Sequence, residues 1–475
     1  MKFADMGDLA LIIPELILVG AALALILAAR RIQNTPLVAA ATVFAALAAA
    51  LVSVWLLSDA PKTGFGIPPM ITVDGYSQFF KVLIASALAL IALLSTKHIE
   101  ALQVRSAEYY ALLLLASTGM MFAASALDLL TLYLGLELAT LCSYILVGIT
   151  VERPRSNEAA IKYFLLGSFA SALLLYGIAL AYGVTGATDI SAIASALTSS
   201  GPENNPILLV AIGLLAAGLA FKISAVPFHA WAPDAYQGAS APVAAFLATA
   251  SKAAGLAALG RVCLVAFGLE ARVFFVVLAV LSMFVGSIIA LTQTDMKRLL
   301  AYSSISHAGY ALLGFISATR DGTEATMTYA FFYVFMTLGA FGVVIALGER
   351  GERLDGYHGL AVQRRGTAAL MLLFLLSLSG IPPTAGFVAK FVVIRSLLHT
   401  GHLALVLLAV LAVVCSVISA FVYLRVALLM YMKEPQEAEP SRCPPTVATA
   451  LVVAALVTVI GGLLPGSLML WVVAP

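Results

Sequence analysis

Charged residues are scarce in this chain. Asp, Glu, Lys and Arg make up 11% of its 475 residues, hydrophobic residues make up 62%, and the mean hydropathy is +1.05. A water-soluble protein of this length needs a more polar surface, so the composition excludes a soluble fold. The uncharged runs are roughly 20 residues long, the length that a helix needs to cross about 30 Å of hydrocarbon. The sequence therefore predicts an all-α polytopic membrane protein.

Cysteine is also rare, and the motifs of cofactor chemistry are missing. None of the four cysteines belongs to a CxxC pair that holds an iron–sulfur cluster, a zinc ion or a redox disulfide, and the chain has no P-loop, no HExxH motif and no GxGxxG motif after a strand. The cysteines are Cys142, Cys263, Cys415 and Cys443. We expect no metal, nucleotide or redox cofactor and no nucleic-acid partner, so the energy for any work must come from a gradient or a partner protein.

About fourteen apolar runs, separated by turn residues, are long enough to span a membrane. The first run follows MKFADMGD, which has no small-residue cleavage site, so we expect it to be retained as a span. The runs lie near residues 9–29, 36–57, 77–96, 107–126, 128–149, 159–183, 206–231, 241–267, 272–292, 299–318, 323–347, 367–398, 402–431 and 446–471.

The loops between these runs differ in positive charge. Lysine and arginine concentrate in the loops on one side of an even alternation, whereas the opposite loops carry isolated cations such as Lys62 and Arg320. The excess of Lys and Arg marks cytoplasmic loops, so both termini are predicted to face away from the cytoplasm. The basic loops hold Arg30 and Arg31, Lys97 and Arg105, Arg153 and Arg155, Lys297 and Arg298, residues 350–365, and Lys433 and Arg442.

Two of the spans are interrupted by proline. The seventh contains Pro227, and the twelfth contains Pro382 and Pro383 in LSLSGIPPTAGFVAKF. Because proline has no N–H, Pro227 leaves the carbonyl of Ile223 without its helical partner, and Pro383 does the same to Ser379. Either break alone is equally well explained as a packing kink.

The two breaks lie five spans apart, which favours a repeat. Spans 4–8 and 9–13 would form two five-helix units, each broken in its fourth helix, and the odd number of helices inverts the second unit. Inverted repeats with broken helices and buried charge are a transporter architecture. We expect a three-helix segment at 1–106, the repeats at 107–267 and 268–431, and a loop with a final helix at 432–475.

Four charged groups lie deep in their spans. Lys252 follows about eleven residues of its helix, roughly 16 Å along a path of about 30 Å. Lys222 adjoins the first break, Lys390 follows the second, and Glu137 is expected to be the only carboxylate inside a span. A structural salt bridge explains any one of them, but four groups on four helices favour function. Burial and nearby charges change how readily a lysine gives up its proton, so these lysines are predicted to titrate.

Other charges in the spans lie near span ends, where long stems let the charged head reach the interface, and we expect these to snorkel. They are Lys81, Arg261, Arg395 and Arg425.

Polar side chains recur at helical spacing on four spans. They predict a hydrated line facing the buried lysines, although interhelical hydrogen bonding explains each stripe singly. The stripes are Tyr133, Glu137 and Tyr144; Ser303, His307 and Tyr310; Tyr329, Tyr333 and Thr337; and Ser416, Ser419 and Tyr423. His307 is the best candidate for a neutral relay, because the unperturbed pKa of histidine is near 6.5.

Four stretches carry a resemblance to a known family: LYLGLELATLCSYIL, FKISAVPFHAWAPDAYQGASAPVAAFLATASKAAG, TQTDMKRLLAYSSISHAGY and SLSGIPPTAGFVAKF. They closely resemble the antiporter-like membrane subunits of respiratory complex I, the proton-pumping NADH:quinone oxidoreductase, over roughly spans 4–13. The resemblance implies roles in proton translocation for the residues that match the family's fifth-helix glutamate, its broken-helix lysine, its central lysine and its twelfth-helix charged residue. It implies the same for one further lysine along this series of charged groups. These residues are Glu137, Lys222, Lys252, Lys390 and Lys162.

Among the members of this family, the chain is most similar to the N-type. The L-type carries a long amphipathic arm after its core spans, and the M-type has glutamate where Lys390 stands. The resemblance implies that NADH, FMN, iron–sulfur clusters and quinone are bound by partner subunits, that the neighbours are the M-type and the small K-, J- and A-type subunits in a lipid bilayer, and that the membrane is the bacterial cytoplasmic membrane, with periplasmic termini. Two alternatives stay open: a subunit of a multisubunit cation/proton antiporter, and a packing scaffold whose ion pairs only set helix register.

Overall fold

Polar side chains mark the starts of several helices. The side chain of Asn34 accepts a hydrogen bond from the Leu37 backbone, and the side chain of Asp74 forms a capping box with Ser77. These caps satisfy backbone N–H groups that have no partner in the first turn of a helix. The apolar runs that follow continue as helices, because a helix satisfies its own backbone hydrogen bonds in hydrocarbon.

The structure is a computed structural model that describes residues 6–29, 34–57, 62–66, 68–200, 205–262, 272–435 and 443–466. Its helices are α1 (Met6–Ala10), α2 (Ile13–Ala28), α3 (Thr35–Leu56), α4 (Gly75–Ala101), α5 (Ser106–Ser125), α6 (Leu129–Val147), α7 (Pro154–Thr185), α8 (Ile190–Ser200), α9 (Pro206–Lys222), α10 (Trp231–Gly238), α11 (Ala241–Phe246), α12 (Lys252–Val262), α13 (Arg272–Ala290), α14 (Met296–Ile316), α15 (Arg320–Leu347), α16 (Leu360–Gln363), α17 (Arg365–Ser379), α18 (Ala385–Leu398), α19 (Leu403–Met432) and α20 (Pro445–Leu463). A π-helical turn, Leu247–Ser251, joins α11 to α12, and 3-10 turns occupy Gly348–Glu352 and Leu354–Tyr357. The strands β1 (Lys62–Gly64) and β2 (Ile71–Val73) pair antiparallel.

The predicted all-α polytopic membrane fold is confirmed. In the described residues, eleven helices are long and apolar enough to cross a membrane, and three shorter apolar helices, α2, α9 and α17, lie within predicted spans. The number of fourteen spans, the inversion of the repeats and the domain ranges stay predictions. The β1–β2 hairpin and α8 were not predicted, because both are too short to give a span-length apolar run.

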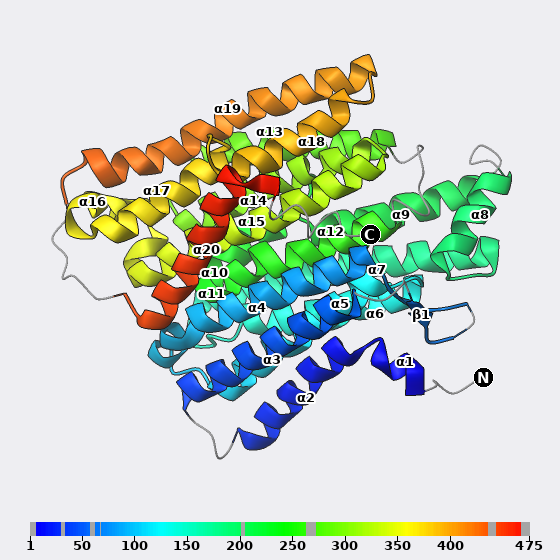
Figure 1. The fold of residues 1–475 in the computed structure, drawn as a ribbon, viewed down its shortest axis with the longest axis horizontal. Helices are drawn as coiled ribbons and strands as arrows, with labels where there is room; N and C mark the ends of the chain where they lie inside the picture. The colour runs from blue at the N-terminus through cyan, green and yellow to red at the C-terminus, as the bar shows by residue number, and fades with distance from the viewer. Residues whose placement is uncertain are drawn as a thin grey trace.

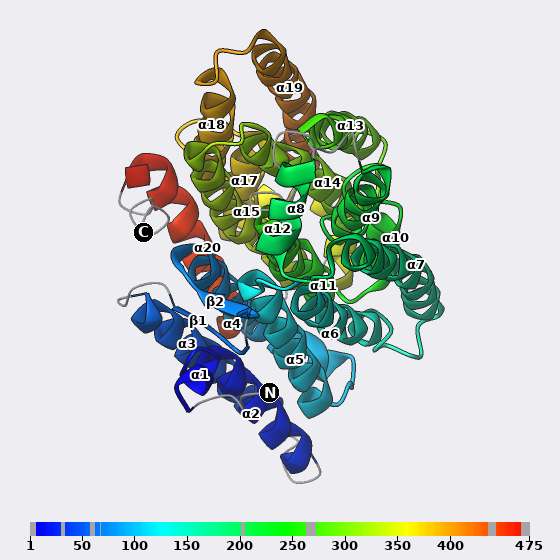
Figure 2. The same cartoon turned by 90° about the vertical axis from the view of Figure 1, so that its right-hand side faces the viewer.

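The long helices lie side by side (Figure 1), with α19 along one edge of the bundle and α1 and α2 along the opposite edge. Strand β1 and helix α8 lie at one end of the helices, and α16 lies at the other end. The end-on view of Figure 2 again places α1, α2 and α3 at one margin and α18 and α19 at the far margin. The N-terminal helices are therefore peripheral to the helices that carry the deep lysines.

Loops from distant parts of the sequence meet at the two ends of the bundle. Asp128 and Asp189 form an isolated β-bridge between the loops that precede α6 and α8. On the basic side, Arg153 Nη2 lies 2.7 Å from Glu349 Oε1, which joins the loop before α7 to the turn after α15. These contacts agree with the predicted alternation of the loops. Which end faces the cytoplasm stays a prediction.

Both predicted helix breaks are confirmed. The first lies between α9 and α10, and the second between α17 and α18. Each break contains a cis peptide bond before a proline, Val226–Pro227 in the first and Pro382–Pro383 in the second. The breaks place non-helical backbone inside the bundle, where side chains can replace the missing helical hydrogen bonds.

Glycines let two pairs of neighbouring helices approach closely. Gly119 of α5 and Gly135 of α6 face each other, and a Cβ added to either would meet the backbone of the other helix. Gly286 of α13 and Gly309 of α14 lie at different heights along the second pair, and a Cβ added to either would likewise meet the backbone of the other helix. Close backbone approach through small residues is the usual way that membrane helices pack. It holds α6 and α14, which carry site residues, firmly against their neighbours.

Candidate functional site

Lys222 is the last residue of α9 and faces Glu137 of α6. Its Nζ lies 3.7 Å from Glu137 Oε1, which is an ion-pair distance but too long for a direct hydrogen bond. The ammonium donates a hydrogen bond to Thr140 Oγ1 at 2.6 Å, and Ser171 of α7 donates to Glu137 Oε1. The Lys222 side chain is 8% exposed and that of Glu137 is 20% exposed. The structure thus brings these two predicted residues together, with the carboxylate nearer to the outer surface of the chain.

Lys252 is the first residue of α12 and follows directly on the π-helical turn Leu247–Ser251. Such turns are rare in proteins, and those that occur are often found at functional sites. The ammonium donates to the Ser304 carbonyl oxygen at 2.6 Å and to Ser304 Oγ at 2.8 Å, and the residue is 2% exposed. Within the described ranges, no carboxylate pairs with Lys252. Its charge is therefore balanced only by the dipoles of neutral groups.

Lys390 lies on α18, beyond the second break. Its Nζ donates to the Ser379 carbonyl oxygen at 2.9 Å and to Ser416 Oγ at 2.8 Å, and lies 4.8 Å from the centre of the Tyr310 ring. Gly380 has a φ of 83°, and a Cβ there would lie 2.8 Å from the Lys390 side chain. A glycine at this position therefore permits both the turn and the approach of the lysine stem. The Ser379 carbonyl is the one that was predicted to be free.

His307 lies between the second and third lysines. Its Nδ1 lies 2.5 Å from the Tyr329 hydroxyl, and its Nε2 lies 3.3 Å from the Tyr423 hydroxyl, which in turn lies 2.5 Å from Ser303 Oγ. His307 is 2% exposed. The polar stripes predicted on α14, α15 and α19 therefore meet around this imidazole, and its contacts fit the predicted relay position.

Two small cavities adjoin the lysines. One, of about 10 Å³, is lined by Lys252, His307, Tyr329 and Tyr333 among others. The other, also of about 10 Å³, lies beside Lys222 and is lined by parts of α6, α9 and the π-helical turn. Each has room for about one water molecule; the cavity beside Lys222 has some polar surface, whereas the surface of the cavity beside Lys252 is apolar. They lie where a hydrated connection would run from Lys222 to Lys252 and on to His307.

Lys162 is not part of this buried group. Its side chain is 47% exposed and lies 2.7 Å from Glu158 Oε1 and 3.1 Å from Asp234 Oδ2 in a surface cleft of about 260 Å³. Burial raises the pKa of Asp234. Hydrogen bonds from Arg298 and Lys162, together with the charges of both, lower it by more than burial raises it, so the pKa lies below its ordinary value. The structure places Lys162 at the surface near the basic loops, and its predicted role in the axis is untested.

Two of the residues that were expected to snorkel are instead buried in ion pairs. Lys81 Nζ lies 2.7 Å from Glu15 Oε1, and both side chains are 0% exposed. The expectation that Glu137 is the only carboxylate inside a span is therefore also wrong. The signal was present in the first span, in IIPELILVG, but depth along one helix does not reveal a partner on another.

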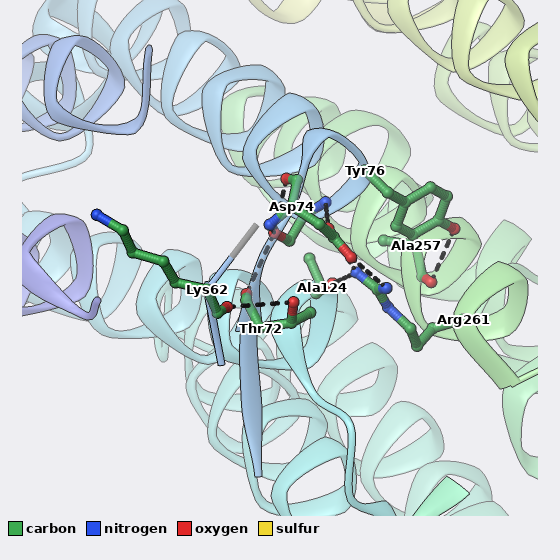
Figure 3. Close-up of polar contacts among 8 residues, drawn as sticks. Lys62, Thr72, Asp74, Tyr76, Ala124, Ala257 and Arg261 are labelled. Atoms are coloured by element: carbon green, nitrogen blue, oxygen red, sulfur yellow. Dashed lines mark hydrogen bonds and ion pairs between the residues drawn. The ribbon is translucent and has the colours of Figure 1, made fainter. Parts of the chain in front are cut away.

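The second of these buried pairs joins the start of α4 to the end of α12 (Figure 3). The Arg261 guanidinium donates to Asp74 at 2.7 and 3.0 Å and to the Ala124 carbonyl oxygen at 3.3 Å. The Tyr76 hydroxyl donates to the Ala257 carbonyl oxygen at 3.0 Å. These contacts fix the far end of the helix that begins with Lys252.

The other two cations expected to snorkel differ from each other. Arg395 is exposed, as expected. Arg425 is partly buried and donates to the backbone carbonyls of Leu291 and Gln293 at the end of α13. Among the cysteines, Cys142, Cys415 and Cys443 are free, and Cys263 lies outside the described residues.

Comparison with known proteins identifies the family. Residues 126–419 match the family described as NADH:quinone oxidoreductase/Mrp antiporter, TM. This match covers more than half of the chain. The chain belongs to this family. Its matched region contains Glu137, the three deep lysines and His307, whereas Glu15 and Lys81 lie outside it.

The relatives and solved structures similar to this antiporter-family chain cover nearly its whole length. It is 43% identical over 460 residues to NADH-quinone oxidoreductase subunit N 2 of Rhizobium meliloti, covering 95% of this chain and 94% of that protein. A chain of respiratory complex I from Thermus thermophilus is 34% identical, with a TM-score of 0.84 and coverage of 97% and 100%. A chain of the Mrp complex from Dietzia sp., 23% identical with a TM-score of 0.85 and coverage of 97% and 96%, shares the fold.

Proposed function

We propose that this chain is a proton-translocating membrane subunit of an NADH:quinone oxidoreductase. Protons move along a line of buried side chains from Glu137 through Lys222 and Lys252 to Lys390, driven by quinone reduction elsewhere in the complex. The observation that carries the proposal is that three ammonium groups lie in the bundle interior with neutral oxygens as their hydrogen-bond acceptors. Ionisable groups at this depth are energetically costly and therefore rare, and those that occur mark ion pathways and proton relays.

Glu137 and Lys222 form the first switch of the line. At 3.7 Å, opposite charges attract by about 4 kcal/mol at an effective dielectric near 20. Any event that removes or neutralises the carboxylate takes this stabilisation away from the ammonium, so Lys222 gives up its proton more readily. The partial exposure of Glu137 suits this role, because a charge on a neighbouring subunit can reach it from outside the chain.

Lys252 and Lys390 form the next two stations, with His307 between them. Among the described residues, Lys252 is bound only by Ser304 oxygens, so no ion pair with them opposes the loss of its proton. The cavity that it shares with His307 has room for about one bridging water molecule. The Tyr423 hydroxyl bound to His307 and the Tyr310 ring beside Lys390 continue the polar contacts into the second unit.

The remaining parts of the proposal concern the assembly. The neighbours are the M-type antiporter-like subunit and the small K-, J- and A-type subunits, and the membrane is a bacterial cytoplasmic membrane with both termini in the periplasm. Partner subunits bind NADH, FMN, the iron–sulfur clusters and quinone. The similarity to NADH-quinone oxidoreductase subunit N 2 of Rhizobium meliloti supports this assignment, because it extends over nearly the whole length of both chains.

A cation/proton antiporter subunit is the second candidate. The fold does not separate the two, since chains from an Mrp complex and from complex I match it with similar TM-scores. Sequence favours complex I, because the identity is 34% to the complex I chain and 23% to the Mrp chain.

Purification from membranes tests the assignment. A tagged chain should co-purify with flavin and iron–sulfur absorbance and with NADH:quinone reductase activity. Proton pumping should then be compared between wild type and Lys252→Met, because methionine keeps much of the stem volume and removes the titrating head. Purification in an assembly without flavin would point to the antiporter, and normal pumping by an assembled Lys252→Met complex would refute the proposed line.

A further inference from the structure

Glu15 of α2 and Lys81 of α4 form an ion pair that the proposed line does not use. Their charged atoms lie 2.7 Å apart, and both side chains are 0% exposed. Neither carboxylate oxygen of Glu15, nor the ammonium of Lys81, has a partner with hydrogen-bond geometry in the described part of the chain. The two charges therefore balance each other, but their hydrogen-bonding capacity is unused.

Further unpartnered polar side chains accompany this pair. Gln78 lies one turn before Lys81 on α4, is 0% exposed, and has no partner for either its amide nitrogen or its amide oxygen among the described residues. Ser53 of α3 and Ser117 of α5 are also 0% exposed, and their hydroxyls have no partner there. Helices α2, α3, α4 and α5 pack against one another.

All five of these residues lie in the half of their helix that is nearer to the β1–β2 hairpin. The hairpin marks this side, because Gly64 lies against Asp8 and Leu11, just before α2, and Ile71 forms a β-bridge with Ala126, just after α5. Gln78 and Lys81 are three residues apart and so lie on neighbouring parts of one helix face. Four packed helices thus each place at least one of these polar side chains in the half nearer to the hairpin.

Unsatisfied polar atoms at full burial require a ligand that can form hydrogen bonds. A carboxylate offers about four acceptor sites, and an ammonium offers three donors. Buried polar groups in native proteins are nearly always paired with protein or with ordered water. The pair carries no net charge, which removes the need for an ion. Water, which donates and accepts and needs two to four polar partners, fits these groups.

We propose that Glu15, Lys81 and Gln78 form a second buried site, which binds ordered water and lets the ion pair share a proton. In the shared state, an N–H bond of the Lys81 ammonium breaks and its proton passes to the bound water, which gives one of its own protons to the Glu15 carboxylate, so that an O–H bond forms there and both groups become neutral. The net charge of the site is unchanged, and no other reactant is needed. The water stabilises both forms, because it can accept from the ammonium and donate to the carboxylate.

The site is independent of the proposed translocation line. None of its residues contributes to the line from Glu137 to Lys390, and it lies outside the region that matches the family, residues 126–419. The competing explanation is a dry ion pair that only fixes the register of α2 on α4, as buried pairs do in some proteins. The two explanations differ in whether water is present and in whether the carboxyl proton exchanges.

The first test uses the wild-type complex. A map of the whole assembly that resolves water should show at least one ordered water molecule within hydrogen-bonding distance of both the Glu15 carboxylate and the Gln78 amide. A site filled by side chains or by a lipid chain, without water, would overturn the proposal. This measurement does not depend on whether any variant assembles.

The second test follows the proton by infrared spectroscopy. The difference spectrum between wild type and Glu15→Gln, both as assembled complexes, should contain the carbonyl stretch of a protonated carboxyl group, and this band should shift in D2O. Lys81→Met is the positive control, because an unpaired buried Glu15 must take up a proton and strengthen the same band. A wild-type spectrum with carboxylate bands alone, or a carboxyl band that D2O does not shift, would show that the pair is dry and only structural.

Discussion

Lys390 Nζ lies 2.9 Å from the Ser379 carbonyl oxygen, the carbonyl that Pro383 leaves without its helical partner. A side-chain donor thus replaces the missing backbone donor. The first break differs: Trp231 Nε1 donates to the Phe221 carbonyl oxygen at 3.0 Å, but that carbonyl also accepts from the Ser224 backbone N–H and is not the Ile223 carbonyl that Pro227 frees. Broken helices at membrane depth need such replacements. In the second break the replacement donor is itself a titratable group, so the structure of the break is tied to the charge of the lysine.

Replacement of Lys390 by methionine should separate these two roles. We expect Lys390→Met to assemble, because Ser416 Oγ also donates to the Ser379 carbonyl oxygen, at 3.2 Å. Proton pumping should fall by about tenfold or more, because a positioned acid–base group typically contributes about 100-fold or more. The measurement is proton pumping per quinone reduced in membrane vesicles, normalised to assembled complex.

Arg395→Met is the matched control for this experiment. It also removes a cation from α18, but one that is exposed and outside the polar contacts of Lys390. It should leave pumping close to the wild-type value. Equal losses in the two variants would mean that any cation on this helix matters, and that Lys390 has no special role.

The sequence predicted the features that depend on one helix at a time. The prolines showed where the helices break, and counting residues showed that Lys252 lies near the middle of its span. It predicted that Glu137 and Lys222 act as a pair, but it did not predict the pairs that bury Lys81 and Arg261, because their partners Glu15 and Asp74 lie far away in sequence.

Two further features could not be read from the sequence. The π-helical turn Leu247–Ser251 has no proline or glycine to mark it, since LATAS also fits an ordinary α-helix. The surroundings of Lys162 were also not predicted. The residue lies only eight positions into a 32-residue helix and reaches surface carboxylates, and its role in the axis, which the family resemblance implies, stays a prediction.

The Asp74–Arg261 pair should make stability depend on pH. Burial raises the pKa of Asp74. The hydrogen bond and charge of Arg261, together with hydrogen bonds from Ser77, lower it by more than burial raises it, so the pKa lies below its ordinary value. A carboxyl group with a lowered pKa in the folded state stabilises the protein above its unfolded pKa, and this stabilisation is lost as the pH falls through the folded pKa. Asp74→Asn should therefore lower the thermal midpoint of the purified complex at neutral pH, by the equivalent of about 1–3 kcal/mol.

The pH series gives this prediction its control. The difference between wild type and Asp74→Asn should be constant from neutral pH down to about pH 5 and should shrink only in more acidic buffers. Glu324→Gln removes a partner from the exposed pair with Arg320 and should change the midpoint little at any pH. A difference that stays the same in acid would show that the charge of Asp74 is not what stabilises α12 on α4.

Impermeant maleimide labelling should settle the orientation. Thr63 in β1 and Arg353 in the loop between α15 and α17 are both exposed, and they lie on loops of opposite predicted side. In whole cells, Thr63→Cys should label and Arg353→Cys should be protected, because the basic loops are predicted to be cytoplasmic. Both should label in opened membranes, in a background that lacks the native cysteines. The reverse pattern in whole cells would place the termini in the cytoplasm.

Glu137 and Lys222 should behave as one electrostatic unit. At 3.7 Å the carboxylate stabilises the ammonium by about 4 kcal/mol at an effective dielectric near 20. Glu137→Gln keeps the shape and the hydrogen bond from Ser171 but removes the charge, so Lys222 should lose its proton more readily and pumping should fall. Glu137→Asp shortens the side chain but keeps the charge, so it should retain much more activity.

The double variant Glu137→Gln/Lys222→Met tests whether the two residues act through each other. Each single change already disables the same switch, so the loss in the double variant should be smaller than the sum of the single losses, with a coupling of about 0.5–3 kcal/mol. Quinone reduction and proton pumping should be measured in membranes for the double variant and all three single variants, normalised to assembled complex. Because Lys222 also donates to Thr140, Thr140→Val is a useful control that removes this acceptor and keeps the ion pair. Strictly additive losses, or equal activity of the Gln and Asp variants, would show that the carboxylate and the ammonium act independently despite lying within ion-pair distance.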